Sequence, residues 1–432
     1  MTRRWPGQLL LALVMAAGMG CYYFEMFLPH SLAVRAAADA AGGYFFANDF
    51  YPIWLTSREC VWRHIDPYSP EITRSIQRGL VGRSLLSPRP GDPASDYRTL
   101  PYPAFVDLYG LPVSWLPFPA ARIVVGFVFL FLIAVSVFLW AKTLGWNLET
   151  PQLLVFVILT WFSYQGLEGM FAEQIGVLSV FLLAMTAASL IDGKLVRSGC
   201  CLALATVKPQ MCALLIFYLM VWALAEWKRR RRFVISFLAT EAWLCLLAML
   251  VWPNWIASWI HSLLTYGDYS RPPLPCALFG FYPGVIVIVA LLAASAVLAW
   301  RRRKASPSTP EFAAAVALLL AVTAVTLLPE HAVYDHLILL PGIMLAMQSR
   351  RQIASGSAVS RGVAALAVAV IAWPWLAAPV VLAMKVAAPA SAAAILFLPV
   401  RTAAAIPFVV LALLFITIRN AQSPAQATAA TP

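Results

Sequence analysis

Charge is scarce in this chain, and its scarcity excludes an ordinary soluble domain. Only 12% of the 432 residues are charged, whereas 62% are hydrophobic and the mean hydropathy is +0.79. Soluble domains carry about 25% charged residues and about 45–50% apolar ones. The composition therefore predicts a polytopic membrane protein.

The sequence also lacks any metal-binding or disulfide framework. It contains no CxxC pair, no HExxH and no acid-rich metal signature. Four of the seven cysteines lie in hydrophobic runs and are interpreted as small buried residues: Cys200, Cys201, Cys212 and Cys245. Cys60 and Cys276 fall in predicted outer loops, where they could pair. We therefore predict no protein-held metal site.

The net charge of +12 does not indicate nucleic-acid binding. The basic runs at 229–232 and 301–304 each adjoin a hydrophobic segment, which is typical of membrane topology signals. The expected partner is the lipid bilayer, with no nucleic acid. Arg3 and Arg4 followed by an apolar run resemble a signal peptide, but the run continues into Tyr22 and favours an uncleaved first helix.

Long apolar runs predict the spanning helices, since a bilayer crossing needs about 20 residues. The first is expected at 9–28, before an outer loop at 29–120 with interfacial helices, one of them at 31–40. Further helices are predicted at 122–140, 151–165, 171–191, 232–251, 284–300, 311–328, 333–348, 362–383 and 392–418. The whole of 1–420 is expected to form one membrane domain, followed by a disordered tail at 421–432.

Basic residues flank both ends of the run at 197–225, and Lys208-Pro209 interrupts its middle. Because proline disfavours helix at the residue before it, we expect a broken hairpin of 198–206 and 210–225. With this hairpin, ten full crossings place both termini and the basic clusters in the cytoplasm. The loops at 29–120, 165–171, 252–283, 329–335 and 384–391 then face outward.

Asp49 follows the first helix, in the sequence NDFYPIW. A carboxylate can take the proton of an attacking sugar hydroxyl, and neighbouring aromatic rings such as Tyr51 offer stacking faces for sugars. The alternative is an interfacial acid that caps a helix or pairs with Arg58.

Other polar residues are predicted near the same outer face, where ionisable groups at membrane depth are functional candidates. Glu173 and Gln174 start a helix, where an acid is ordinarily a dipole partner, although Gln174 could equally bind an acceptor sugar. Lys208 is a candidate phosphate ligand, and snorkelling is its alternative.

His331, Asp335 and His336 lie in the outer turn PEHAVYDH, where a histidine could contact a phosphate leaving group. Five residues apart, the two histidines do not share a helical face, so a two-histidine metal site is not expected. The loop at 261–283, with Arg271, has the aromatic and polar mixture of a carbohydrate-contacting segment.

Six stretches in this order resemble the family 87 glycosyltransferases of the GT-C superfamily, which depend on polyprenyl-phosphate sugars and include alpha-1,2-mannosyltransferases. They are NDFYPIW, DPYS, LPYPAF, EGMFAEQIGVL, LALATVKPQ and PEHAVYDHLILL, and they span about 8–350. The sequence departs from the family pattern at Glu173-Gln174, where an acid replaces a small residue, and at Asp335-His336, where paired histidines are frequent.

The resemblance implies a GT-C fold and an inverting transfer of a hexose, mannose-like, or a pentose from a polyprenyl-phosphate donor to a glycolipid or glycan acceptor. It places the reaction outside a bacterial plasma membrane. Asp49 matches the family's catalytic acid, His336 its outer histidine, and Lys208 its Lys-Pro. Lys208 with Arg58 or Arg271 would hold the phosphate, and Tyr51, Glu173, Gln174, His331 and Asp335 would contact acceptor or sugar. No cofactor is expected, although the scheme leaves room for a divalent ion.

Three other functions remain open from the sequence. A flippase or transporter of lipid-linked sugars would place polar residues through the full membrane depth, whereas here they gather at one face. A polysaccharide ligase would concentrate its arginines and histidine in one large late loop, and the late loops are short. A non-catalytic membrane scaffold would be indifferent to Asp49.

Overall fold

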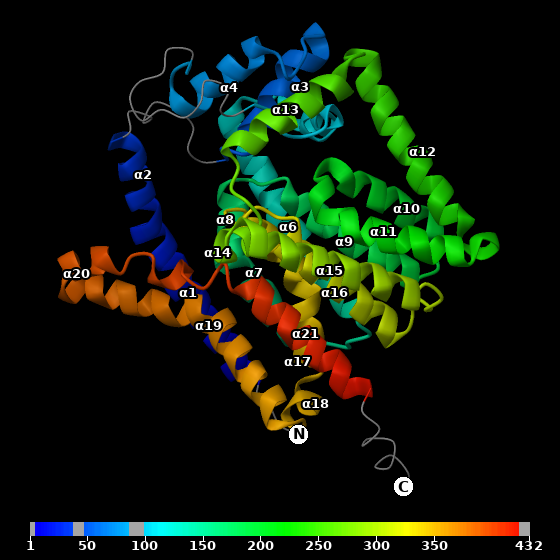
Figure 1. The fold of residues 1–432 in the computed structure, drawn as a ribbon. Helices are drawn as coiled ribbons and strands as arrows, with labels where there is room; N and C mark the ends of the chain where they lie inside the picture. Colours follow the sequence, from blue (N-terminus) through cyan, green and yellow to red (C-terminus); the bar gives the residue numbers. More distant parts are fainter. Residues whose placement is uncertain (1–4, 38–46, 86–98, 423–432) are drawn as a thin grey trace.

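The structure is a computed structural model that describes residues 5–37, 47–85 and 99–422. These residues form helices throughout and no β-strand, as the all-α prediction requires. Helices α3, α4 and α13 gather at one end of the molecule, and α1 begins and α21 ends toward the other (Figure 1). The predicted tail lies outside the described residues from 423 onward.

The first membrane helix is longer than predicted. α1 (Trp5–Tyr22) continues through a π-helical turn (Tyr23–Phe27) into α2 (Leu28–Ala37). The expected interfacial helix at 31–40 is instead the end of this first helix, and positions 38–40 lie outside the described residues. π-helices usually occur as single turns inside an α-helix. Here the turn lies just before Pro29.

The outer segment after residue 46 is partly helical. α3 (Tyr51–Arg63) begins with a proline in its first turn and ends at His64 in the left-handed region, φ 53°. α3 packs on α5 (Asp107–Ser114), where the Thr56 hydroxyl donates to the buried Asp107 carboxylate at 2.6 Å. Burial raises the pKa of Asp107 well above its usual value, and the hydrogen bond from Thr56 opposes this rise. The remaining short elements are α4 (Pro70–Val81) and η2 (Ala104–Val106).

A bundle of longer helices forms the centre. Its members are α6 (Phe118–Thr143), α7 (Thr150–Trp161), α8 (Tyr164–Phe171), α9 (Gly176–Ile191), α10 (Leu195–Leu204), α11 (Pro209–Ala225) and α12 (Trp227–Val251). α7 and α8 meet at a bend of 63°. α6 packs against α9, and α10 against α12. The predicted interruption at Lys208-Pro209 is confirmed. α10 is followed by a 3-10 turn at Ala205–Val207, and α11 begins at Pro209.

The predicted loop at 261–283 is wrong in form, because most of it is helical. α13 (Trp255–Tyr269) and α14 (Leu274–Phe279) occupy it. Trp255, Trp259 and Ser262 recur at a helical spacing, and this periodicity outweighs the polar residues that suggested a loop.

The C-terminal part consists of α15 (Phe281–Arg301), α16 (Pro310–Thr326), η4 (Val333–Leu339), α17 (Leu340–Gln348), α18 (Arg350–Ala354), α19 (Ala358–Ala387), α20 (Pro389–Ala394), η5 (Leu398–Val400) and α21 (Ile406–Gln422). The single helix predicted at 392–418 is wrong. Pro399 interrupts this stretch, and Pro407 lies in the first turn of α21, where a proline is readily tolerated. Cys60 and Cys276 are both free thiols, so the suggested pairing does not occur in this structure.

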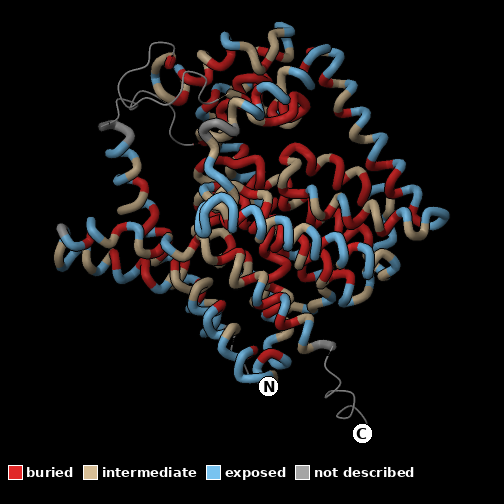
Figure 2. The backbone as a smooth tube through the Cα atoms, viewed as in Figure 1, coloured by how far each residue is buried: buried red, intermediate tan, exposed pale blue. Residues whose placement is uncertain are grey.

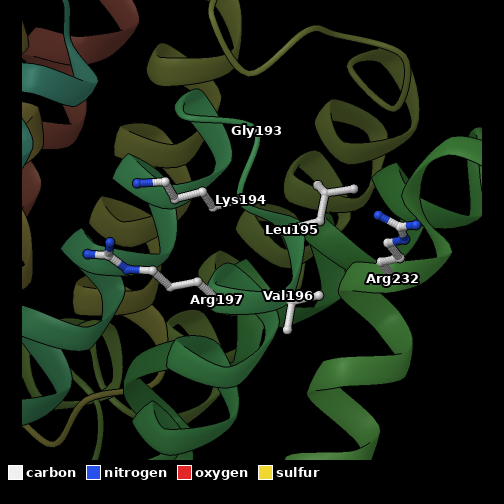
Figure 3. Close-up of a pocket in the computed structure, with 6 residues that line it drawn as sticks. All are labelled: Gly193, Lys194, Leu195, Val196, Arg197 and Arg232. Carbon is white, nitrogen blue, oxygen red and sulfur yellow. The ribbon is translucent and has the colours of Figure 1, made fainter.

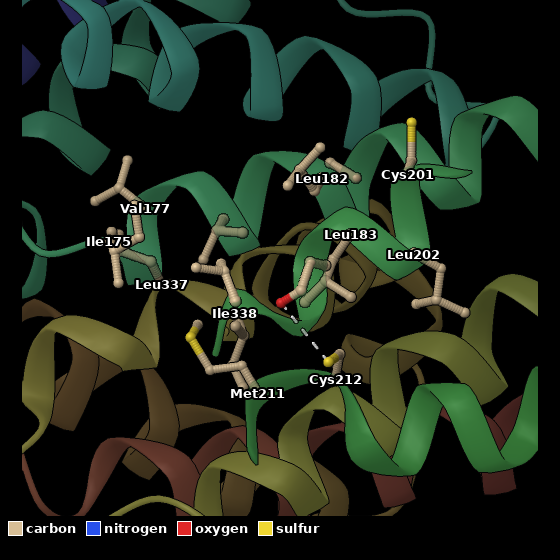
Figure 4. Packing of buried hydrophobic residues seen from close by; sticks show 14 of the residues in the cluster. Ile175, Val177, Leu182, Leu183, Cys201, Leu202, Met211, Cys212, Leu337 and Ile338 are labelled. Carbon is tan, nitrogen blue, oxygen red and sulfur yellow. Dashed lines mark hydrogen bonds between the residues drawn. The ribbon is translucent and has the colours of Figure 1, made fainter. Parts of the chain in front are cut away.

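Five described helices are long and apolar enough to cross a membrane, or six if α7 and α8 form one bent span. The count of ten crossings therefore remains a prediction. Buried residues concentrate in the central bundle, while α1, α2 and α19 expose more of their surface (Figure 2). Figure 4 shows the core where α9 and α11 meet the segment before α17, with Ile175, Val177, Met211, Leu337 and Ile338 packed together.

Candidate active site

The segment that carries Asp49 is attached to the turn between α8 and α9. Ala47 donates its backbone N–H to the carbonyl of Phe171 at 2.9 Å, and Asp49 donates to that of Ala172 at 3.1 Å. The Gln174 side chain then donates from Nε2 to Asp49 Oδ2 at 2.6 Å. Backbone and side chain of Asp49 are thus held by the same short turn.

Glu173 and Gln174 face different surroundings. Glu173 has a left-handed backbone, φ 49°, which costs a residue with a side chain about 1–2 kcal/mol. Gln174 contacts Asp49, whereas Glu173 lines a pocket of about 430 Å³ together with Arg122 and Gly126 of α6 and Phe24. The sequence treated both as acceptor contacts, but only Gln174 contacts Asp49.

Burial raises the pKa of Glu173 to about 9, and the positive charge of Arg122 opposes this rise. Glu173 is therefore a neutral acid at pH 7. Its Oε2 atom is buried without a hydrogen-bond partner in the described chain. The pocket walls are otherwise mainly apolar, and Phe127 of α6 is exposed beside it.

Lys208 and Asp335 form a buried ion pair. Lys208 Nζ lies 2.7 Å from the Asp335 carboxylate, and the two side chains are 5% and 0% exposed. The ammonium also lies 5.0 Å from the centre of the Tyr334 ring. Lys208 has a non-helical backbone before Pro209, with φ −130° and ψ 77°, because proline disfavours the helical conformation at the residue before it.

Gly176 makes this pairing sterically feasible. A Cβ atom added at Gly176 would collide with Asp335 Oδ1 and would lie 3.3 Å from Met211 Sδ and 3.4 Å from Lys208 Nζ. Only glycine allows the pair to lie against the first turn of α9.

His331 is under the electrostatic influence of charged groups of both signs. Burial lowers the pKa of His331, and the charges of Arg271 and Lys208 lower it further, while Asp49 and Glu330 oppose them. These influences place the histidine within electrostatic range of Asp49 as well as of the Lys208 side. Arg271 pairs with Glu330 at 3.0 Å and is 68% exposed. The structure therefore brings Asp49, Lys208, Arg271 and His331 to one region.

Other predicted site residues lie elsewhere. Tyr51 is buried against Phe118 and lies over Gly79, so its ring is part of the core. Arg58 contacts the Trp54 ring, Glu59 and the carbonyl of Leu116, and none of these belongs to the Asp49 region. His336 is buried with both ring nitrogens unpartnered in the described chain. Its role at a leaving group remains a prediction.

Two residues at the site were not predicted. Tyr102 donates its hydroxyl to Gln174 Oε1 at 2.9 Å, and Tyr334 stacks near Lys208. Both lie in stretches that carry the family resemblance, LPYPAF and PEHAVYDH. A tyrosine hydroxyl inside a proline-rich apolar stretch was the available signal for Tyr102, since buried hydroxyls need partners.

A second pocket, of about 470 Å³, lies at the turn between α9 and α10, and three of its lining residues are the cations Lys194, Arg197 and Arg232. Figure 3 shows that Lys194 and Arg197 point to one side of the pocket, whereas Arg232 lies across Leu195 on the other. The charges diverge and do not define an anion site. No group of His, Cys, Asp and Glu side chains that could hold a metal occurs within the described ranges.

The apolar helices and the polar cluster at their ends define a polytopic membrane protein with a candidate catalytic site. The chain belongs to glycosyltransferase family 87, whose family model matches residues 100–329. This span contains Tyr102, Gln174, Lys208 and Arg271, and excludes Asp49 and Asp335. No curated protein and no solved structure matches the chain. Family membership indicates glycosyl transfer as the activity.

Proposed function

We propose that this protein is an inverting glycosyltransferase that moves a hexose, mannose-like, or a pentose from a polyprenyl-phosphate donor to a glycolipid or glycan acceptor at the outer face of a bacterial plasma membrane. The observation that carries the proposal is the Asp49 carboxylate, held by the neutral amide of Gln174 in the region of Arg271 and His331. A fixed, half-buried carboxylate near cationic groups suits proton abstraction beside a departing phosphate.

The reaction is a single displacement. Asp49 takes the proton of the acceptor hydroxyl as its oxygen bonds to the anomeric carbon of the donor sugar. The bond from this carbon to the phosphate oxygen breaks, and polyprenyl phosphate leaves with the electron pair. Attack opposite to the leaving group inverts the anomeric configuration.

The phosphate is proposed to lie beside Arg271, the most exposed cation of the cluster. Lys208 is 4% exposed and already contacts Asp335. It is therefore proposed to act on the phosphate through its positive charge at a distance and not by direct contact. Arg271 also pairs with Glu330, and a phosphate would compete with that carboxylate for the guanidinium.

The donor's hydrocarbon chain is proposed to occupy the pocket lined by Phe24, Gly126 and Glu173. Its walls come from the first helix, α6 and α8, which belong to candidate membrane spans. A hydrocarbon chain in this pocket would enter from the bilayer. Its head group would then lie near Gln174, since Glu173 in the pocket wall is the preceding residue. The neutral state of Glu173 at pH 7 makes the pocket compatible with hydrocarbon.

The test is transfer from radiolabelled polyprenyl-phosphate sugars by the purified, liposome-reconstituted protein. Asp49→Asn is expected to lower kcat by about 100- to 10,000-fold, with donor binding retained. Asp192→Asn is the matched control, because Asp192 pairs with Lys142 at 2.7 Å and lies outside the site. Equal activity of Asp49→Asn and wild type would remove Asp49 from the mechanism. Movement of lipid-linked sugar across the liposome without transfer would favour the flippase.

A further inference from the structure

The hydrogen bonds around Gln174 have a fixed direction. An ionised carboxylate only accepts hydrogen bonds, so the atom of Gln174 that faces Asp49 at 2.6 Å is the amide nitrogen. The amide oxygen then faces Tyr102 at 2.9 Å and must receive the phenolic hydrogen. The chain runs from the Tyr102 hydroxyl through the amide to the Asp49 carboxylate.

Tyr102 is suited to donate this hydrogen bond. Burial raises the pKa of Tyr102 well above its usual value, and the carboxylates of Asp49 and Asp335 raise it further. The phenol therefore remains protonated throughout the working pH range. Gln174 is 2% exposed and Tyr102 is 9% exposed, so water does not readily replace either partner.

The backbone that carries Tyr102 is anchored by three successive carbonyl groups. Leu100 accepts from the Ser262 hydroxyl at 2.8 Å, Pro101 from the Trp259 indole at 3.2 Å, and Tyr102 from the Tyr68 hydroxyl at 2.7 Å. α13 therefore holds the segment at 100–102 in place, and Tyr102 of this segment holds the side chain of Gln174. Asp66 extends the network, since it accepts from Ser258 of α13 at 2.9 Å and from the Tyr68 backbone at 2.9 Å.

We infer that Tyr102 is a positioning residue for the Asp49 base, and that it acts through the amide of Gln174. This inference rests on the proposed function, because it assigns a role in proton abstraction. A hydrogen bond to the amide oxygen of Gln174 polarises the amide. It thereby strengthens the hydrogen bond that the amide N–H donates to the Asp49 carboxylate. Tyr102 thus orients Asp49 Oδ2 without touching substrate.

The test compares Tyr102→Phe with Tyr109→Phe in the reconstituted full-length protein. Tyr109 is the matched control, since its hydroxyl also donates one hydrogen bond, to the carbonyl of Leu204 at 2.9 Å, outside the site. We expect Tyr102→Phe to lower kcat by about 3- to 10-fold, the range of one hydrogen bond, with the donor KM unchanged. The acidic limb of the kcat profile should move to higher pH, because the Gln174 amide, no longer polarised by the phenol, donates a weaker hydrogen bond to the charged form of Asp49.

A double-mutant cycle tests the route through the amide. In a Gln174→Leu background, which already lacks the connection, Tyr102→Phe should change kcat by less than about twofold. Multiplicative effects of the two substitutions would overturn the inference, as would equal kcat values and pH profiles in Tyr102→Phe and Tyr109→Phe. A wild-type protein without transfer from any donor would overturn the proposed function itself, and the positioning role with it.

Discussion

Asp49 and Asp335 are two aspartates that lie near the same turn, in different surroundings. Asp335 is fully buried and paired with Lys208. Asp49 is half-buried and accepts from the neutral amide of Gln174. Lys208 compensates the charge of the buried Asp335 carboxylate and fixes its position, whereas the half-buried Asp49 carboxylate, held by an amide, stays accessible to a substrate. On this contrast we propose a structural role for Asp335 and the catalytic role for Asp49.

The largest expected effect comes from the same substitution at both aspartates. Asp49→Asn should keep its thermal stability in detergent while it loses transfer. Asp335→Asn leaves Lys208 as an uncompensated buried charge, which typically costs about 3–5 kcal/mol, so it should unfold at a much lower temperature. Thermal unfolding and transfer assays on both variants provide the comparison. Loss of stability in Asp49→Asn, with Asp335→Asn unchanged, would reverse the assignment.

Removing both charges of the ion pair sharpens the assignment of Asp335. Lys208→Met alone should destabilise the protein by about 3–5 kcal/mol, whereas Lys208→Met with Asp335→Val should recover most of that loss, because neither charge is left buried. The double variant also isolates the role of Lys208 at the donor. If the positive charge of Lys208 helps to bind the donor phosphate, the double variant should fold and show a raised KM for the donor. An unchanged KM would limit Lys208 to a structural role.

Glu173 adds a third acid, and its raised pKa predicts how stability depends on pH. In the folded state the pKa is about 9, against an ordinary value of 4.5, so between these values the unfolded chain releases a proton that the folded chain keeps. Stability should therefore fall as pH rises through this window, by up to about 1.4 kcal/mol per pH unit. Unfolding measured at pH 6 and pH 8 should show this slope in wild type and a smaller one in Glu173→Gln. Identical slopes would mean that Glu173 is ionised in its pocket.

Gly176→Ala is expected to produce the smallest change. The added methyl group meets Asp335 Oδ1 and approaches Met211 Sδ, and overpacking of this kind costs about 1–3 kcal/mol. Gly362→Ala is the control, since nothing lies within 4 Å of a Cβ atom there. A modest loss of stability confined to Gly176→Ala would support the close approach of the ion pair to α9. Equal stability of both variants would contradict it.

The sequence by itself predicted much of the helical organisation. Long apolar runs marked α6, α12, α15, α16 and α19 to within a few residues, because each contains enough hydrophobic residues to form a membrane-length or buried helix. Lys208-Pro209 correctly marked an interruption, since proline restricts the residue before it. The failures came where polar composition suggested a loop although the residues recur at a helical spacing, as in α13, or where Pro399 interrupted an apolar run.

The sequence also determined which residue types were available for chemistry, because acids are few in an apolar chain and Asp49, Glu173 and Asp335 stand out. It could not decide which of them pair. Gln174 meets Asp49 and Glu173 turns to the pocket because one residue adopts a left-handed backbone. Lys208 meets Asp335 across 127 positions of sequence, and Tyr102 reaches Gln174 across 72. Such contacts depend on how helices pack, and packing between distant segments leaves no local pattern in the chain, so only the tertiary structure separated the structural acid from the candidate base.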